Sequence, residues 1–159
     1  MTAAEQQFVV HDEPVWRDRA NFIVNAELRE ADSPKRFEQL WTRQLGEAEF
    51  EVCCIPFFLY DLALGDVVMT APKDDRRYVV HQVVRPSGRY VFRVWFGESF
   101  HPREAVAEAL EALGALVEWS SVNLLAVDAE NDERAQGVAD YLDTREKRGE
   151  LMFETGRSA

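Results

Sequence analysis

The sequence predicts an α+β protein in which a small β-barrel or curled antiparallel sheet is followed by a ferredoxin-like β-α-β-β-α-β unit. In the first half, apolar side chains recur at every second position in short runs, which is the period of a strand. In the second half, two segments carry apolar side chains at helical spacing, and strand-like runs surround them. The chain has 159 residues and 47% hydrophobic side chains, so it can bury a core without disulfides.

The chain divides where this pattern changes. Residues 1–19 are polar and unpatterned, and we expect them to form a loose lead-in. Residues 20–88 are the predicted β-rich subdomain. Residues 89–159 are the predicted ferredoxin-like α+β subdomain, because the order of its elements predicts one sheet with two helices on the same face.

The first predicted strand covers residues 22–28, where apolar and polar side chains alternate. Residues 36–45 allow two interpretations. A Ser-Pro pair just before them could begin a short helix, whereas their alternation also fits a strand. Because Gly46 and a second alternating run at residues 49–54 follow as in a hairpin, we favour the strand.

Residues 55–64 interrupt this alternation, because Pro56 cannot donate a hydrogen bond to a neighbouring strand. Most of the segment is apolar or aromatic. Such a segment either fills a core or forms an exposed hydrophobic patch, and Phe57 and Phe58 are its candidate binding residues. The strands predicted after it lie at residues 67–70 and 77–84.

The second half begins with a strand at residues 90–96. Pro102 suits the first turn of a helix and Gly114 its end, while a second helix begins near Asn131 and ends at Gly149. The side chains predicted to face the core from these helices are Val106, Leu110, Leu113, Ala135, Val138, Ala139 and Leu142. The remaining predicted strands are residues 115–119, 122–129 and 150–154.

The charge of the chain limits its partners. The formal net charge is −11, and residues 99–159 carry 13 acidic and 6 basic side chains. Phosphate backbones repel such a surface and no basic patch is visible, so we expect no nucleic-acid partner. The same charge would attract a basic protein partner. The candidate acidic binding residues on the outer helix faces are Glu104, Glu108, Glu111 and Asp140.

Neither a membrane span nor a disulfide is predicted. No apolar stretch reaches the roughly 18 residues that a membrane helix needs. Residues 1–13 lack the basic start and apolar core of a secretory signal, so we expect a cytoplasmic protein without a membrane partner. The two cysteines, Cys53 and Cys54, are adjacent and are predicted to stay reduced.

The sequence contains no complete catalytic or metal-binding motif, and we predict no cofactor and no metal. The three histidines, His11, His81 and His101, stand at no metal-binding spacing. Residues 97–101 resemble the turn around a catalytic serine, but His101 replaces its last glycine and no later histidine completes a triad. A loop that leads into a helix explains these residues better.

Arg93 is the most unusual charged residue, because Phe92 and Val94 flank it in an otherwise apolar strand. It is either an exposed edge residue or a buried cation that needs a carboxylate or backbone partner. Glu118 and Asp128 are the candidate carboxylates.

An enzyme built on this chain would place its site between the two subdomains, where polar groups at strand ends meet. The residues available for that site are Arg93, His81, Asp66 and Ser87. His81 shares a strand face with Val79 and Val83, which favours a structural histidine over a catalytic base.

Several short motifs resemble those of a known family. In chain order they are Phe-Glu-Gln-Leu-Trp at 37–41, Leu-Gly at 45–46, Ile-Pro-Phe-Phe at 55–58, Gly-Asp-Val-Val at 65–68, Ser-Gly at 87–88 and Arg-Val at 93–94. With them the chain resembles the bacterial domain-of-unknown-function family 4265 over about residues 22–153. It departs from the family pattern at Cys54 and at Arg89-Tyr90. The resemblance implies a bacterial cytoplasmic protein and supplies no activity or catalytic residues.

Three functions remain open. The leading hypothesis is a non-catalytic protein-binding protein, for example an immunity-type inhibitor of a basic toxin, because acidic charge steers association with a cationic partner. The alternatives are a small enzyme with its site between the two subdomains and a ligand-sensing regulatory domain. The oligomeric state stays open as well.

Overall fold

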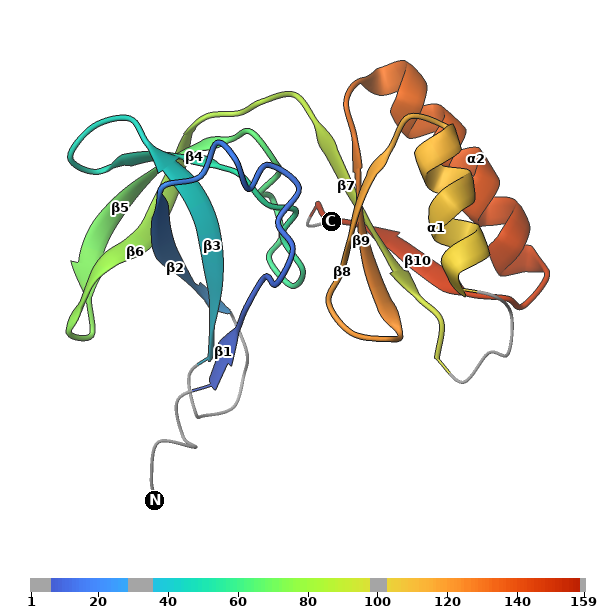
Figure 1. The fold of residues 1–159 in the computed structure, drawn as a ribbon, viewed down its shortest axis with the longest axis horizontal. Helices are drawn as coiled ribbons and strands as arrows, with labels where there is room; N and C mark the ends of the chain where they lie inside the picture. The colour runs from blue at the N-terminus through green and yellow to red at the C-terminus, as the bar shows by residue number, and fades with distance from the viewer. Residues whose placement is uncertain (1–6, 29–35, 98–102, 158–159) are drawn as a thin grey trace.

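Two β-sheets and two α-helices make up the part of the chain that the computed structural model describes, which is residues 7–28, 36–97 and 103–157. Figure 1 shows the sheet of the first half on one side of the molecule and the sheet of the second half on the other. Both helices lie on the outer face of the second sheet. The protein is therefore α+β, as the sequence predicts.

The first half forms a mixed six-stranded sheet that nearly closes into a ring. Its strands are β1 (Gln7–Val9), β2 (Phe22–Leu28), β3 (Arg36–Gln44), β4 (Glu49–Val52), β5 (Val67–Lys73) and β6 (Arg76–Arg85). The strand order is β1-β3-β2-β6-β5-β4, and β3 also pairs with β4. The sheet is not antiparallel throughout, because β1 pairs with β3 and β2 with β6 in parallel. Long stretches of chain separate both pairs, which parallel pairing requires.

Residues 36–44 are the strand β3, which decides between the two interpretations of this segment. β3 pairs with β2 in antiparallel register, from Phe22 opposite Thr42 to Leu28 opposite Arg36. Its backbone groups are thus satisfied in the sheet, and Leu40 is fully buried among the apolar residues inside the curled sheet.

Residues 7–19 are more ordered than the sequence predicts. β1 adds to the edge of β3, turns stabilised by backbone hydrogen bonds span residues 14–20, and the His11 side chain is buried. The contacts that order this segment include Glu118, which is more than a hundred residues away. A local polar pattern does not reveal partners at that distance.

The second half forms an antiparallel sheet with the order β10-β7-β9-β8. Its elements are β7 (Tyr90–Trp95), α1 (Arg103–Ala112), β8 (Leu116–Trp119), β9 (Leu124–Ala129), α2 (Asp132–Lys147) and β10 (Met152–Thr155). The side chain of Asn131 caps α2 by accepting a hydrogen bond from the backbone N–H of Arg134. The strands and helices of this half therefore follow one another in the predicted order, β-α-β-β-α-β.

The helices bury most of the side chains that their spacing predicts. The core between helices and sheet includes Val106 and Leu110 of α1 and Val138 and Leu142 of α2. Leu113 differs from the prediction, because α1 ends before it and its side chain is 39% exposed.

Residues 53–64 pack between the two sheets and contact both of them. Cys54 and Leu62 pack inside the curled sheet, while Ile55 and Phe57 pack against the face of the second sheet that the helices leave free. The apolar segment is therefore largely core, although Phe58 and Tyr60 are exposed. Both cysteines are free thiols and both are buried.

Candidate functional site

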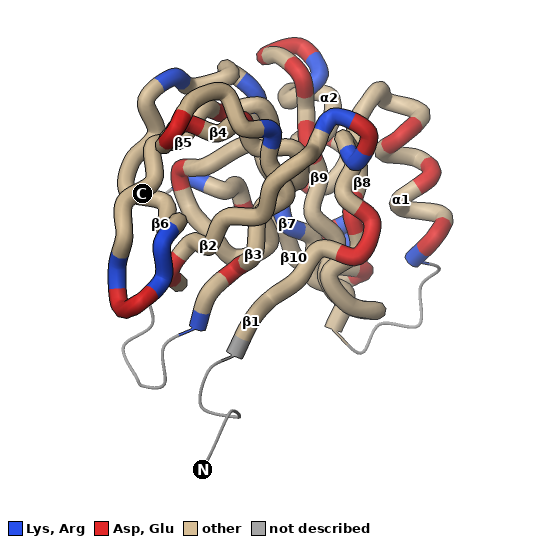
Figure 2. Tube along the Cα trace, turned by 60° about the vertical axis from the view of Figure 1, so that its left-hand side comes forward, with Lys and Arg blue, Asp and Glu red and all other residues tan. Residues whose placement is uncertain are grey.

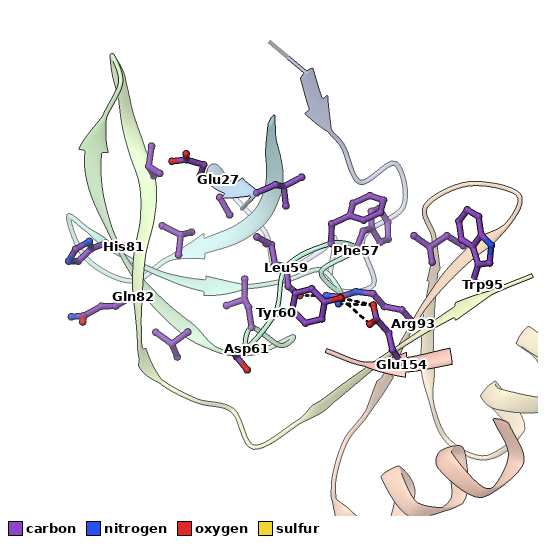
Figure 3. A pocket seen from close by; sticks show the side chains of 18 of the residues that line it. Glu27, Phe57, Leu59, Tyr60, Asp61, His81, Gln82, Arg93, Trp95 and Glu154 are labelled. Atoms are coloured by element: carbon purple, nitrogen blue, oxygen red, sulfur yellow. Dashed lines mark hydrogen bonds and ion pairs between the residues drawn. The ribbon is translucent and has the colours of Figure 1, made fainter. Parts of the chain in front are cut away.

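A pocket of about 1140 Å³ lies between the two sheets, and we call it the inter-sheet pocket. One wall comes from β2 and β6, and the opposite wall from β7, β9 and β10. Residues 57–62 form its floor. Figure 3 shows this arrangement, with His81 and Gln82 on the β6 side and Arg93, Trp95 and Glu154 on the side of the second sheet.

Arg93 contributes a buried positive charge to the pocket. Its side chain is 4% exposed, and its Nη2 donates a hydrogen bond to the backbone carbonyl of Leu59. The nearest carboxylate is Glu154, whose Oε1 lies 3.8 Å from Nη1. Within the described residues, Nε and Nη1 have no hydrogen-bond partner. Burial lowers the pKa of Arg93, because removal from water disfavours the charged form.

Tyr60 and Glu154 cover the guanidinium of Arg93 on the side of the pocket. The Tyr60 hydroxyl lies 2.9 Å from each Oε atom of Glu154 and donates to this carboxylate. The centre of the Tyr60 ring lies 4.9 Å from the Arg93 guanidinium, which places the cation over the aromatic face. Both side chains are about half exposed, so they can move aside without unfolding of the core.

A second group of charged side chains lies behind the pocket floor, and we call it the His11 cluster. His11 Nε2 is 2.7 Å from Glu38 Oε2, and His11 Nδ1 is 2.8 Å from Glu118 Oε1. All three side chains are almost completely buried. The imidazole ring also stacks on Phe57 at a centroid distance of 3.9 Å.

The geometry of the His11 cluster suits a charged histidine. A neutral imidazole has one N–H, but both ring nitrogens here face a carboxylate oxygen, so only the imidazolium donates to both. Burial opposes this charge, but hydrogen bonds with Cys54, Glu118 and Glu38 outweigh it and raise the pKa of His11 from 6.5 to about 12. Burial also raises the pKa of the Cys54 thiol.

The same carboxylates hold the pocket floor in place. Glu118 Oε2 accepts the backbone N–H of Ile55 at 2.6 Å. Glu38 accepts the backbone N–H groups of Phe57 at 2.7 Å and Phe58 at 2.9 Å. Because β3 carries Glu38 and β8 carries Glu118, the His11 cluster joins both sheets and the loop between them.

The structure brings only some of the sequence-predicted candidates together. Arg93, His81, Phe57 and Phe58 all line the inter-sheet pocket. His81 is exposed on the β6 wall, which does not fit a structural role in the core. The carboxylate nearest to Arg93 is that of Glu154, and not that of Glu118 or Asp128 as predicted. The Arg93 side chain itself is buried and does not lie at an exposed edge.

Asp66 and Ser87 lie outside the pocket lining and stabilise a turn. Asp66 accepts the backbone N–H groups of Ala63 at 2.9 Å and Ser87 at 2.7 Å. The Ser87 hydroxyl donates to the Leu64 carbonyl at 2.7 Å. Gly65 lies between these partners with a positive φ of 84°, where an added Cβ would stand 3.1 Å from the Ser87 Cβ.

The predicted acidic residues of the helices are exposed and far from this pocket. Figure 2 shows acidic positions along α1 and α2. Residues 98–102, with the serine and histidine of the predicted helix-entry loop, lie outside the described residues. The exposed helix residues named above are Glu104, Glu108, Glu111 and Asp140.

Sequence reasoning missed the roles of His11, Glu38, Glu118, Tyr60 and Glu154. One signal was present. Glu38 lies beside a buried phenylalanine in an alternating strand, and Glu118 occupies the single buried position of β8. A carboxylate at an inward strand position needs a buried partner, and this pattern could have directed attention to the polar lead-in.

Two absences bear on the site. In the described part of the chain, no group of three or more His, Cys, Asp or Glu side chains is arranged to hold a metal ion. Among the same residues, no helix has the length and apolar character to cross a membrane.

Residues 38–153 match the family described as Domain of unknown function (DUF4265), and this match covers well over half of the chain. The protein belongs to this family. The motifs at residues 37–94 therefore indicated the correct family. The match includes the pocket floor, Arg93, and both glutamates of the His11 cluster, whereas His11 itself precedes the matched region.

A solved structure similar to this DUF4265 protein is titled "Novel crystal structure of a hypothetical protein from Neisseria gonorrhoeae". The TM-score is 0.72 at 18% sequence identity, and the likeness covers 85% of this chain and 93% of that chain. At this identity the likeness concerns the fold alone. No curated protein matches the chain.

Proposed function

We propose that this DUF4265 protein is a non-catalytic binding protein whose inter-sheet pocket takes an anionic ligand on Arg93. The observation that supports this is a buried guanidinium with two nitrogens that have no hydrogen-bond partner among the described residues. A buried charge without full compensation destabilises the folded state. A ligand carboxylate or phosphate would supply the missing acceptors.

Binding is favoured over catalysis because Arg93 is a buried cation of the pocket, whereas Lys73, another cation of its lining, is exposed and pairs with Glu27. Asp66 and Ser87 were two of the residues considered for an enzyme site. Their polar groups instead stabilise a turn outside the pocket. His81 lies on the wall opposite Arg93 (Figure 3). A pocket in which the candidate base His81 stands apart from Arg93 fits recognition of a ligand better than acid–base chemistry.

An NMR titration tests the proposal. The side-chain Nε–H signals of ¹⁵N-labelled protein are followed during addition of acetate and, separately, inorganic phosphate. We expect a saturable shift of the Arg93 signal, which is assigned by its loss in Arg93→Met. Arg85→Met is the matched control, because Arg85 is exposed and lies outside the pocket lining. An Arg93 signal that does not move with either anion would refute an anion site.

The same variant separates a ligand-binding arginine from a structural one. If Arg93 serves a ligand, Arg93→Met should melt at the same temperature as the free wild-type protein or higher, since it removes an undercompensated buried charge. If the ion pair with Glu154 stabilises the fold, the variant should melt clearly lower, by an amount that Glu154→Gln reproduces.

A basic protein partner is a second candidate, and the acidic outer faces of α1 and α2 favour it (Figure 2). Exposed charges of one sign attract a cationic partner over distances of about 8 Å at physiological salt. An immunity-type inhibitor of a basic toxin would use this face.

We also infer that the second sheet and its two helices form a ferredoxin-like unit, because the strand order is β10-β7-β9-β8.

A further inference from the structure

Strands β2 and β6 separate soon after they meet, and the inter-sheet pocket opens between them. Within the described residues, the two strands pair at one register position, Asn25 opposite Val79. β2 nevertheless pairs with β3 along its full length, and β6 pairs with β5 from one end to the other. Residues 26–28 and 80–83 beyond the meeting point line the pocket.

This separation leaves strand edges in the pocket wall. Alternate residues of a strand direct their N–H and C=O groups to opposite edges, and β5 occupies one edge of β6. The other edge, over residues 80–83, has no strand partner among the described residues. An extended chain that entered here could pair with β6 and complete the ring of strands.

Parts of the pocket floor and of the far wall suit a chain with apolar side chains. Phe57, Leu59 and Leu62 lie on the floor, and the exposed side chains of Trp95 and Met152 stand on the far wall. The volume of about 1140 Å³ exceeds the usual range for small-molecule pockets. It therefore has room for several residues.

The position of Arg93 indicates which part of a bound ligand chain enters the pocket. Arg93 lies across the pocket from β6, next to Tyr60 and Glu154 (Figure 3). A chain paired with β6 must leave that strand to reach it. The end of a bound chain can reach Arg93, because no further residues then have to pass Tyr60 and Glu154. Of the two ends of a chain, the C-terminal carboxylate is the one that matches a guanidinium.

We propose that the ligand of the inter-sheet pocket is the extended C-terminal segment of a protein, which pairs with β6 and places its terminal carboxylate on Arg93. This inference rests on the proposed anion site and adds the class of ligand. Backbone hydrogen bonds to β6 would supply affinity, while the apolar floor would select alternate side chains.

Peptide selection from synthetic pools tests the inference. Three randomised pools are made, with peptides of about six residues, enough to span the free edge of β6 at ~3.3 Å per residue. The first has free C-terminal acids, the second C-terminal amides, and the third amides with one internal glutamate. Each is passed over immobilised wild-type protein, Arg93→Met and the control Arg85→Met.

We expect wild type and Arg85→Met to enrich apolar peptides from the acid pool only, with binding at least tenfold tighter than to the same sequences as amides. Arg93→Met should enrich none. Hydrogen exchange with the best peptide should then protect backbone amides within residues 80–83. Enrichment from the internal-glutamate pool alone, equal enrichment of acids and amides, or no protection of β6 would each overturn the inference.

The two proposals can fail separately. If acetate or phosphate shifts the Arg93 signal and no pool is enriched, the anion site stands and the peptide ligand is wrong. If neither anion nor peptide binds, both proposals are wrong.

Discussion

The stability of this protein should fall steadily as the pH rises above neutrality, because of His11. The folded state holds His11 as an imidazolium between Glu38 and Glu118 at distances of 2.7 and 2.8 Å. Its pKa is about 12 in the folded protein and 6.5 in the reference state. The test is therefore to change the pH and to compare the wild-type protein with the variant His11→Gln, which lacks the titrating imidazole.

The sign follows from proton linkage. A raised pKa in the folded state contributes stability that is fully present below pH 6.5 and is lost as the pH approaches about 12. Over most of that window the unfolded chain has lost its proton and the folded protein retains it. The slope is then about 1.4 kcal/mol per pH unit, so stability falls by about 2 kcal/mol between roughly pH 7 and 8.5. For a protein of this size, that corresponds to a drop of about 4–8 °C in melting temperature.

Urea unfolding at several pH values measures this directly. The upper limit stays below pH 9.0, because the pKa values of both cysteine thiols are raised from that value and their titration would add to the slope. His81→Gln is the matched control, since His81 is exposed and should leave the slope unchanged. His11→Gln leaves two buried carboxylates without a cation, so it should lose about 3–5 kcal/mol and also the slope.

A flat stability profile of the wild-type protein between about pH 7 and 8.5 would show that His11 is not held as a cation. The same slope in His11→Gln would assign the effect to another group. If His11→Gln does not fold, the wild-type profile and the His81→Gln control still decide the question.

Three further outcomes are expected. Leu110→Asp puts an unpaired charge at a fully buried position of α1, so calorimetry should show a loss of about 3 kcal/mol or more, and an unchanged melting temperature would contradict the core assignment. Asn131→Ala removes the cap of α2 and should cost about 1 kcal/mol in urea unfolding, whereas Asn131→Asp should cost far less. Charge reversal on the helices should leave the melting temperature nearly unchanged but slow association with a basic partner about tenfold in stopped-flow at low salt, with little effect at high salt. Equal rates at all salt concentrations would count against the acidic face. The residues to replace by lysine are Glu104, Glu108, Glu111 and Asp140.

Local pattern was enough to predict the elements of this protein. Alternation predicted β2 and β4, and helical spacing predicted the buried faces of α1 and α2. These predictions succeed because the period of a strand or helix is a property of neighbouring residues, and one buried face imposes it directly on the sequence. Short motifs likewise indicated the family, since they depend on spacing within one part of the chain.

Only the tertiary structure decided which charges meet. Arg93 faces Glu154 because β10 pairs with β7 in a register that no local pattern specifies. His11 lies between Glu38 and Glu118, which are 27 and 107 residues away from it. Part of the lead-in, including Val9 and His11, is therefore buried, and the pocket arises where β2 and β6 separate. Charged groups are mobile and solvated in the unfolded chain, so their pairing is determined by the packing of both sheets and not by their neighbours in the sequence.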